Sequence, residues 1–156
     1  RIGEENRGWY VGMTLLDFER SNITGAVSAR RTLDALTSYM KTDEGKSKSP
    51  GAEANRTALA DRYIETEVMF NFSFRIISMQ DRGLIPNHEA SVSKLFASEM
   101  SQRIANLSMH LFGMHGNVRN RASNGYMQAV SSTIAGGTTE VQKGIIATRG
   151  LGLPRG

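Results

Sequence analysis

Apolar residues recur at intervals of three and four along most of the chain, and nowhere do they alternate with polar residues as in a strand. This spacing places apolar side chains on one face of a helix. It predicts long helices over 8–42, 54–82 and 88–112, a shorter helical segment near 122–134 and a last helix near 138–148. Because most connections between them are short, we expect an all-α fold: an up-down antiparallel four-helix bundle with a short extra C-terminal helix.

Two segments qualify this expectation. Residues 42–53, TDEGKSKSPGAE, are rich in Ser, Lys and Gly and contain Pro50, which predicts a flexible loop. The helix over 54–82 carries two apolar stripes, Leu59, Tyr63, Phe70, Phe74 and Ile77 on one and Ile64, Val68, Phe72, Ile76 and Met79 on the other. A helix that is apolar on two faces is expected to be buried on both. An oligomer, or a further domain of the same polypeptide, would supply the second cover.

The composition excludes several classes of protein. The 156 residues suit one domain over 1–156, and the absence of cysteine excludes disulfide and thiolate chemistry. No apolar run approaches the roughly 20 residues of a membrane span, and the first residues do not read as a signal peptide, so we expect a cytoplasmic protein without a span. The 19 basic residues are scattered among 15 acidic ones, which argues against nucleic acid as a partner. The spacing of His110 and His115 is not that of metal ligands, so no metal is expected.

The segment GGTTEVQ at 136–142 separates two helical patterns. Glycines before a helix permit a tight turn, and Thr138 or Thr139 can cap the helix that follows. The N–H groups at such a helix start can also bind an anion, but a capped helix after a glycine turn is the plainer interpretation.

Read with two other segments, this one resembles the C-terminal signature of the acyl-CoA dehydrogenase family. The three segments that carry the resemblance are ENRGWYVGMTLLDFERSNITGAVSARRTLDAL at 5–36, EASVSKLFASEMSQRIANLSMHLFGMHG at 89–116 and GGTTEVQKGIIATRGLGLPR at 136–155. Their order and spacing match the helical C-terminal domain of that family. The resemblance implies that the family's N-terminal helical domain and central β domain lie outside these residues, and that the isolated domain is inactive.

The resemblance also implies a reaction, the α,β-dehydrogenation of an acyl-CoA thioester in fatty acid or sterol β-oxidation. In the family a carboxylate removes the α-proton, and the flavin N5 of FAD takes the β-hydrogen as a hydride. Hydrogen bonds to the thioester carbonyl stabilise the negative charge that develops there. A carboxylate suits the base when burial raises its pKa.

The position of the base separates two branches of the family. Many members carry it directly before the Gly-Thr of the signature, where this chain has Gly136. A second branch, similar to the isovaleryl and long-chain enzymes, carries it on the first helix of this domain, where LLDFER at 15–20 places Glu19. Glu19 follows Leu16 by three residues and precedes Ile23 by four, which predicts an inward-facing carboxylate. The alternative is an ordinary surface glutamate.

Further roles follow from the resemblance alone. The backbone N–H of Gly136 is implied to bind the thioester carbonyl. Asp17 is expected near the CoA or pantetheine end of the substrate, and Arg20 is expected to fix local geometry. The residues implied to contact FAD are Gly137, Thr138, Glu140, His110 and Gly113, the last two on a loop that reaches across a subunit interface.

Two departures from the family pattern concern the flavin site. Met114 stands where many members have glycine, and 38–50 lacks the Arg-x-x-Phe-Gly motif that reaches a neighbouring subunit's flavin. Expected partners are acyl-CoA, the other domains of the enzyme, an electron-transfer acceptor and further subunits in a homo- or hetero-oligomer (a dimer or a tetramer). Two alternatives stay open: one subunit of a hetero-oligomeric dehydrogenase with fewer active sites, or a cofactor-free helical assembly module.

Overall fold

The computed structural model describes the backbone of residues 1–19 and 21–155 and the side chains of 1–15 and 21–155. Its elements in chain order are α1 (Gly8–Glu19), α2 (Ile23–Lys41), α3 (Asp43–Lys48), α4 (Arg56–Asp81), α5 (His88–Phe112), the 3₁₀ turn η1 (Gly113–Asn117), α6 (Arg121–Ser132), α7 (Thr139–Ile145) and the π turn η2 (Ile146–Gly150). Every regular element of the described residues is helical, which confirms the all-α prediction.

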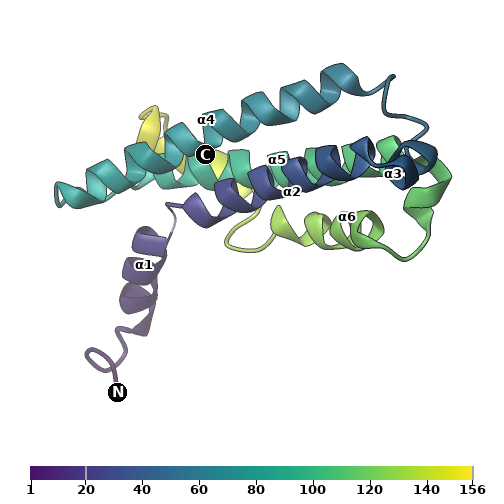
Figure 1. Cartoon of the computed structure of the whole chain (residues 1–156). Coiled ribbons are helices and arrows are strands. Elements are labelled where there is room, and N and C mark those ends of the chain that lie inside the picture. The colour runs from purple at the N-terminus through teal and green to yellow at the C-terminus, as the bar shows by residue number, and fades with distance from the viewer. Residues whose placement is uncertain (20, 156) are drawn as a thin grey trace.

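The helices α2, α4, α5 and α6 run up and down beside one another, as predicted (Figure 1). Helix α4 packs against both α2 and α5, and α6 packs on α5. The core between α2, α4 and α5 is built from Ala26, Leu33, Met69, Met100 and Ile104. Helix α1 projects away from this bundle (Figure 1), and the short α7 closes the chain.

The first predicted helix is broken in two. Asn22 has a φ of 56°, and the chain turns there before α2 begins at Ile23. Asparagine tolerates this left-handed conformation better than most residues, since its short polar side chain can bond locally. The prediction of one continuous helix over 8–42 was therefore wrong, and helical spacing cannot be counted across residues 20–22.

The loop predicted over 42–53 is also wrong in part, because α3 lies within it. The Thr42 hydroxyl accepts a hydrogen bond from the N–H of Gly45 at 3.0 Å and so caps this helix. Lys48 and Glu44 form an ion pair one turn apart at 2.6 Å. A threonine followed by two acidic residues is a helix start signal that outweighs the Ser, Lys and Gly content.

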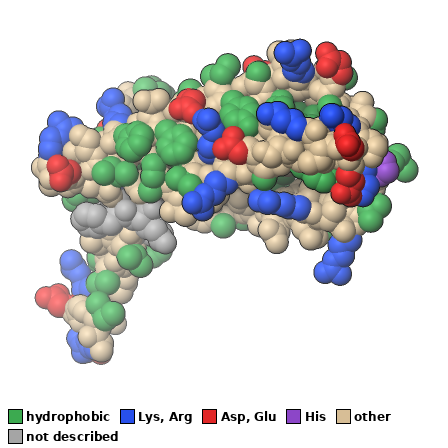
Figure 2. Space-filling view, in the orientation of Figure 1, with side chains coloured by type: hydrophobic (Ala, Val, Ile, Leu, Met, Phe, Trp, Pro, Cys, Tyr) green, Lys and Arg blue, Asp and Glu red, His purple; other side chains and the backbone are tan. Residues whose placement is uncertain are grey.

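Helix α4 buries one face rather than two. Its buried residues are Thr66, Met69, Ser73 and Ile76. Large apolar side chains of both predicted stripes stay exposed, among them Ile64 (62%), Val68 (38%), Phe74 (59%) and Ile77 (39%). Figure 2 shows apolar side chains gathered over the part of the surface where the second half of α4 lies. The predicted burial on both sides is thus not achieved within this chain.

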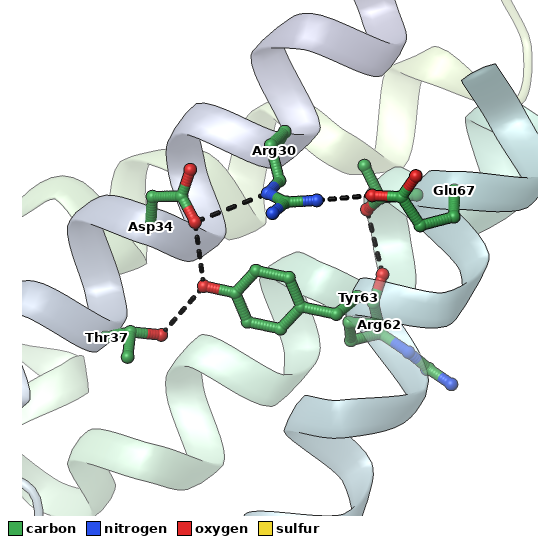
Figure 3. Close-up of polar contacts among 7 residues, drawn as sticks. Arg30, Asp34, Thr37, Arg62, Tyr63 and Glu67 are labelled. Carbon is green, nitrogen blue, oxygen red and sulfur yellow. Dashed lines mark hydrogen bonds and ion pairs between the residues drawn. The ribbon is translucent and has the colours of Figure 1, made fainter.

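A polar network fixes α4 against α2 (Figure 3). The Tyr63 hydroxyl donates to the Asp34 carboxylate at 3.0 Å and lies 3.0 Å from the Thr37 hydroxyl. Arg30 pairs with Asp34 at 3.4 Å and with Glu67 across the helix pair. The directional contacts set the register of two helices whose apolar contacts alone would tolerate sliding.

A groove of about 1370 Å³ runs between α2, α5 and α6. Its walls carry many small side chains, such as Ala29, Thr32, Ser98, Ala122 and Ala129. Because the helices are antiparallel, the start of α2, the start of α5 and the end of α6 meet at one end of the groove. The glycine pair at 136–137 follows α6 at this same end.

Candidate functional site

The turn between α6 and α7 depends on two glycines. Gly136 has a φ of 68° and Gly137 a φ of 102°, both in the left-handed region that disfavours other residues. Helix α7 then starts at Thr139, and the Thr138 hydroxyl caps it by accepting from the N–H of Val141 at 3.3 Å. The capped-turn interpretation of the sequence is therefore confirmed.

Two side chains hold the carbonyl groups of this turn. The Gln142 side-chain amide donates to the Gly136 carbonyl at 2.9 Å, and the Lys94 ammonium donates to the Gly137 carbonyl at 2.5 Å. Gln142 is 1% exposed. A Cβ at Gly137 would lie 2.5 Å from the Gln142 side-chain nitrogen, so no larger residue fits that position without displacing the contact.

Gly136 itself faces open space. The residue is exposed, and a Cβ there would touch only the Cε of Lys94, at 3.8 Å. Within the described part of the chain its N–H donates to no acceptor. The turn therefore presents a backbone donor beside a lysine ammonium, with the carbonyls of Gly136 and Gly137 already bonded. Burial lowers the pKa of that ammonium below its usual range.

Glu140 lies in the first turn of α7 and is exposed. Hydrogen bonds from its own backbone N–H and from the Thr138 hydroxyl lower the pKa of its carboxyl. A carboxylate that keeps its charge accepts hydrogen bonds from hydroxyl or amino groups and repels phosphate. Thr138 and Glu140 are thus brought together by the cap and can act on one ligand group.

His110 and Gly113, also expected at the flavin site, lie elsewhere. His110 and Lys94 are both on α5, so the helical rise separates them by about 24 Å. Gly113 ends α5 with a φ of 52°. The segment after α3 covers this end of the helix, since the N–H of Gly51 donates to the Leu111 carbonyl at 3.1 Å. The predicted flavin residues therefore form two groups that one chain does not bring together.

The predicted base and substrate residues fall at the junction of α1 and α2. The backbone of α1 ends at Glu19, but the side chains of Asp17 and Glu19, and all of Arg20, lie outside the described residues. The inward direction predicted for Glu19 relied on helical spacing from Leu16 to Ile23. The break at Asn22 removes that argument, although the chain order still places Glu19 just before the start of α2.

Comparison with known proteins decides the family. The model of the acyl-CoA dehydrogenase C-terminal domain matches residues 6–151. The chain belongs to the acyl-CoA dehydrogenase family. This domain is the family's helical C-terminal one, in agreement with the fold described above.

Several acyl-CoA dehydrogenases are similar over nearly the whole chain. FadE26 of Mycobacterium tuberculosis is 27% identical over 170 residues, which cover 99% of this chain and 42% of FadE26. The crystal structure of an acyl-CoA dehydrogenase from Geobacillus kaustophilus superposes with a TM-score of 0.78 at 27% identity, over 97% of this chain and 40% of that one. The ChsE4–ChsE5 complex of Mycobacterium tuberculosis matches with a TM-score of 0.71 at 27% identity, over 99% of this chain and 43% of that one. The chain thus spans about two fifths of the length of these relatives.

Sequence reasoning missed the two residues that anchor the turn of this acyl-CoA dehydrogenase domain. Lys94 lies 43 residues before Gly137, and no local spacing links them. The role of Gln142 could have been predicted from the sequence, because it follows the glycine pair within the first turns of α7. A buried glutamine next to two glycines is a signal of a side chain that bonds a turn.

Proposed function

We propose that this domain supplies the base and a carbonyl-binding donor to a FAD-dependent acyl-CoA dehydrogenase that oxidises an acyl-CoA thioester between its α and β carbons. The observation that carries the proposal is the turn at Gly136. It has space, an exposed N–H and no side chain at the position where many family members carry their base. The acyl group and the other domains of the enzyme are left unspecified.

Proton removal is assigned to Glu19. Helix α1 ends at Glu19 and α2 begins at Ile23, and the turn at Gly136 follows α6, so both segments lie toward the same end of the bundle. In the reaction the carboxylate of Glu19 takes the α-proton. Asp17 is assigned to the CoA or pantetheine end of the substrate and Arg20 to the geometry of the base.

Carbonyl binding is assigned to the backbone N–H of Gly136. A donor aimed at the thioester oxygen stabilises the charge that develops as the α-proton leaves. A main-chain donor does not depend on the side chain, so it persists where the base has moved elsewhere. The absent side chain also leaves room for a bulkier or branched acyl group.

The residues fit FAD as two separate half-sites. Gly137, Thr138 and Glu140 form one, whose hydroxyl and carboxylate suit hydroxyl or amino groups of the cofactor rather than its phosphates. His110 and Gly113, at the far end of α5, form the other. FAD, when bound, would accept the β-hydrogen as a hydride. A second subunit would have to bring its own half-site to complete each flavin site.

This requirement favours an oligomer. The exposed apolar residues of α4, with Ile64 and Phe74 more than half exposed, offer a surface for it. The match to the ChsE4–ChsE5 complex makes an unlike second subunit the main alternative to a copy of the same chain. If the subunits are unlike, the chain that carries Glu19 is the catalytic one.

The deciding experiment replaces Glu19 by Gln in the complete enzyme. We expect the reduction of bound flavin by acyl-CoA to fall by at least about 10²–10⁴-fold, since that is the usual contribution of a general base. FAD content, measured by absorbance, should be unchanged. Flavin reduction at the original rate would remove Glu19 from this role. A complete enzyme without any flavin absorbance would favour the cofactor-free assembly module.

A further inference from the structure

Lys94 links α5 to the turn at Gly136 and Gly137. Among the described residues, no other α5 side chain forms a hydrogen bond with these two glycines. Its ammonium reaches the Gly137 carbonyl at 2.5 Å, and its Cε lies 3.8 Å from where a Gly136 Cβ would be. The same side chain lines the groove between α2, α5 and α6. It therefore touches the turn from the groove side.

The turn has few other restraints. Both glycines lack side chains, and their φ values of 68° and 102° belong to a region that glycine enters and leaves easily. Gln142 holds the Gly136 carbonyl from α7, and Lys94 bonds the Gly137 carbonyl directly to α5. The side-chain oxygen of Gln142 is buried with no partner among the described residues, so the amide nitrogen is its only anchor there.

We propose that Lys94 is a positioning residue, which fixes the Gly137 carbonyl so that the Gly136 N–H stays aimed at the thioester carbonyl. The proposal rests on the function assigned to Gly136 above. Rotations about the backbone bonds of Gly136 and Gly137 would redirect the Gly136 N–H, and Lys94 opposes them because it holds the carbonyl that follows both glycines. Its positive charge also lies beside the oxygen on which negative charge develops, which adds to the stabilisation by the backbone donor.

The charge is held there at an energetic disadvantage. Burial lowers the pKa of Lys94, so the folded protein favours the ammonium less than water does. No acidic partner of Lys94 is found among the described side chains.

The test compares Lys94→Met and Lys94→Arg with Lys41→Met in the complete enzyme. Lys41 is an exposed lysine at the end of α2, at the far end of the groove. The first readout is the ultraviolet absorption of a bound enoyl-CoA, because hydrogen bonding to a conjugated thioester carbonyl shifts its absorption. The second is deuterium uptake by residues 133–141, which needs neither cofactor nor substrate. The third is kcat and KM for acyl-CoA.

We expect Lys94→Met to reduce the shift, to raise the deuterium uptake, and to lower kcat about 10–100-fold with a smaller change in KM, since misplacing a donor by about 1 Å has effects of this size. Lys94→Arg should restore part of the shift, and Lys41→Met should match the unchanged enzyme. An unchanged shift in Lys94→Met overturns the proposal. If Lys94→Met does not fold, Lys94→Gln replaces it: a shift smaller than that of Lys41→Met supports the proposal, and a shift equal to that of Lys41→Met overturns it.

The Glu19→Gln experiment keeps this proposal separate from the proposed function. Loss of flavin reduction in Glu19→Gln together with no effect in Lys94→Met defeats only the role of Lys94. Unchanged reduction in Glu19→Gln defeats the assigned base, while the enoyl-CoA shift still reports on Lys94 and the turn.

Discussion

Gly136 adopts a left-handed conformation with a φ of 68°, and this decides what a side chain there would cost. A non-glycine residue in that region costs about 1–2 kcal/mol. The surroundings add little, because a Cβ would meet only Lys94 Cε at an ordinary contact distance of 3.8 Å. A glutamate can therefore be introduced at a modest loss of stability.

We predict that Gly136→Glu partly restores flavin reduction to the Glu19→Gln enzyme, because both positions are assigned to one substrate carbon. Recovery should stay below the original rate, since the nearby Lys94 ammonium would lower the pKa of the new carboxyl and weaken it as a base. Stopped-flow flavin reduction measures this. Gly144→Glu, at an exposed α7 position with nothing within 4 Å of its Cβ, is the control. A folded, flavin-loaded double variant no faster than Glu19→Gln would contradict the shared site.

For single residues, the sequence predicted features that depend on neighbouring positions, but it did not predict a contact between residues far apart in the chain. The absence of a carboxylate at Gly136 and the cap at Thr138 could both be read from local order. Lys94 could not, because its bond to Gly137 joins residues 43 apart and a lone lysine on a helix usually faces water. The direction of the Glu19 side chain stays a prediction.

Among the elements, the pair α2 and α4 depends on the hydroxyl of Tyr63. That hydroxyl donates to Asp34 and receives a hydrogen bond from Thr37 (Figure 3). Removing it in Tyr63→Phe should lower the free energy of unfolding by about 1 kcal/mol near pH 7, the usual contribution of a hydrogen bond. Urea denaturation measures this free energy of unfolding. Tyr126→Phe, on an exposed α6 tyrosine, should change stability by less.

The stability lost in Tyr63→Phe depends on pH. Burial raises the pKa of the Tyr63 hydroxyl above its usual 10.0, so the folded chain holds this proton more tightly than the unfolded chain. The resulting stability is present below pH 10 and is lost as the pH rises through the raised value. The difference between Tyr63→Phe and the unchanged chain should therefore shrink above pH 10. A constant difference from pH 7 upward would show that Tyr63 does not titrate as described.

Element boundaries were predictable where periodicity was strong and ended at a clear stop. Helix α5 spans His88–Phe112, matching the predicted 88–112, because its apolar spacing is regular and Gly113 ends it. The break at Asn22 and the cap at Thr42 were missed for one reason. Each depends on a single polar residue, the left-handed Asn22 or the Thr42 cap, and averages over a window of residues hide such single positions.

The molecule as a whole leaves an apolar surface on α4 that one chain does not cover. The second apolar face predicted for α4 is exposed in the single chain, and its cover by an oligomer or a further domain stays a prediction. Under the proposed function the two flavin half-sites lie at opposite ends of α5, so a second subunit would supply both the cover of α4 and the missing half-site. Sequence periodicity can indicate that a helix has a second apolar face, but it cannot identify the molecule that covers this face.

We predict that Ile64→Lys combined with Phe74→Lys lowers the number of subunits in the complete enzyme and its FAD content together. Both side chains are more than half exposed in the single chain, at 62% and 59%, so the changes should disturb the interface more than the fold. Light scattering after size-exclusion chromatography counts the subunits, and absorbance measures the flavin. Val130→Lys, at a 53% exposed position on α6, is the matched control. An intact oligomer that unfolds more easily would show instead that another domain of the same polypeptide covers α4, because such a contact stabilises the fold without joining subunits.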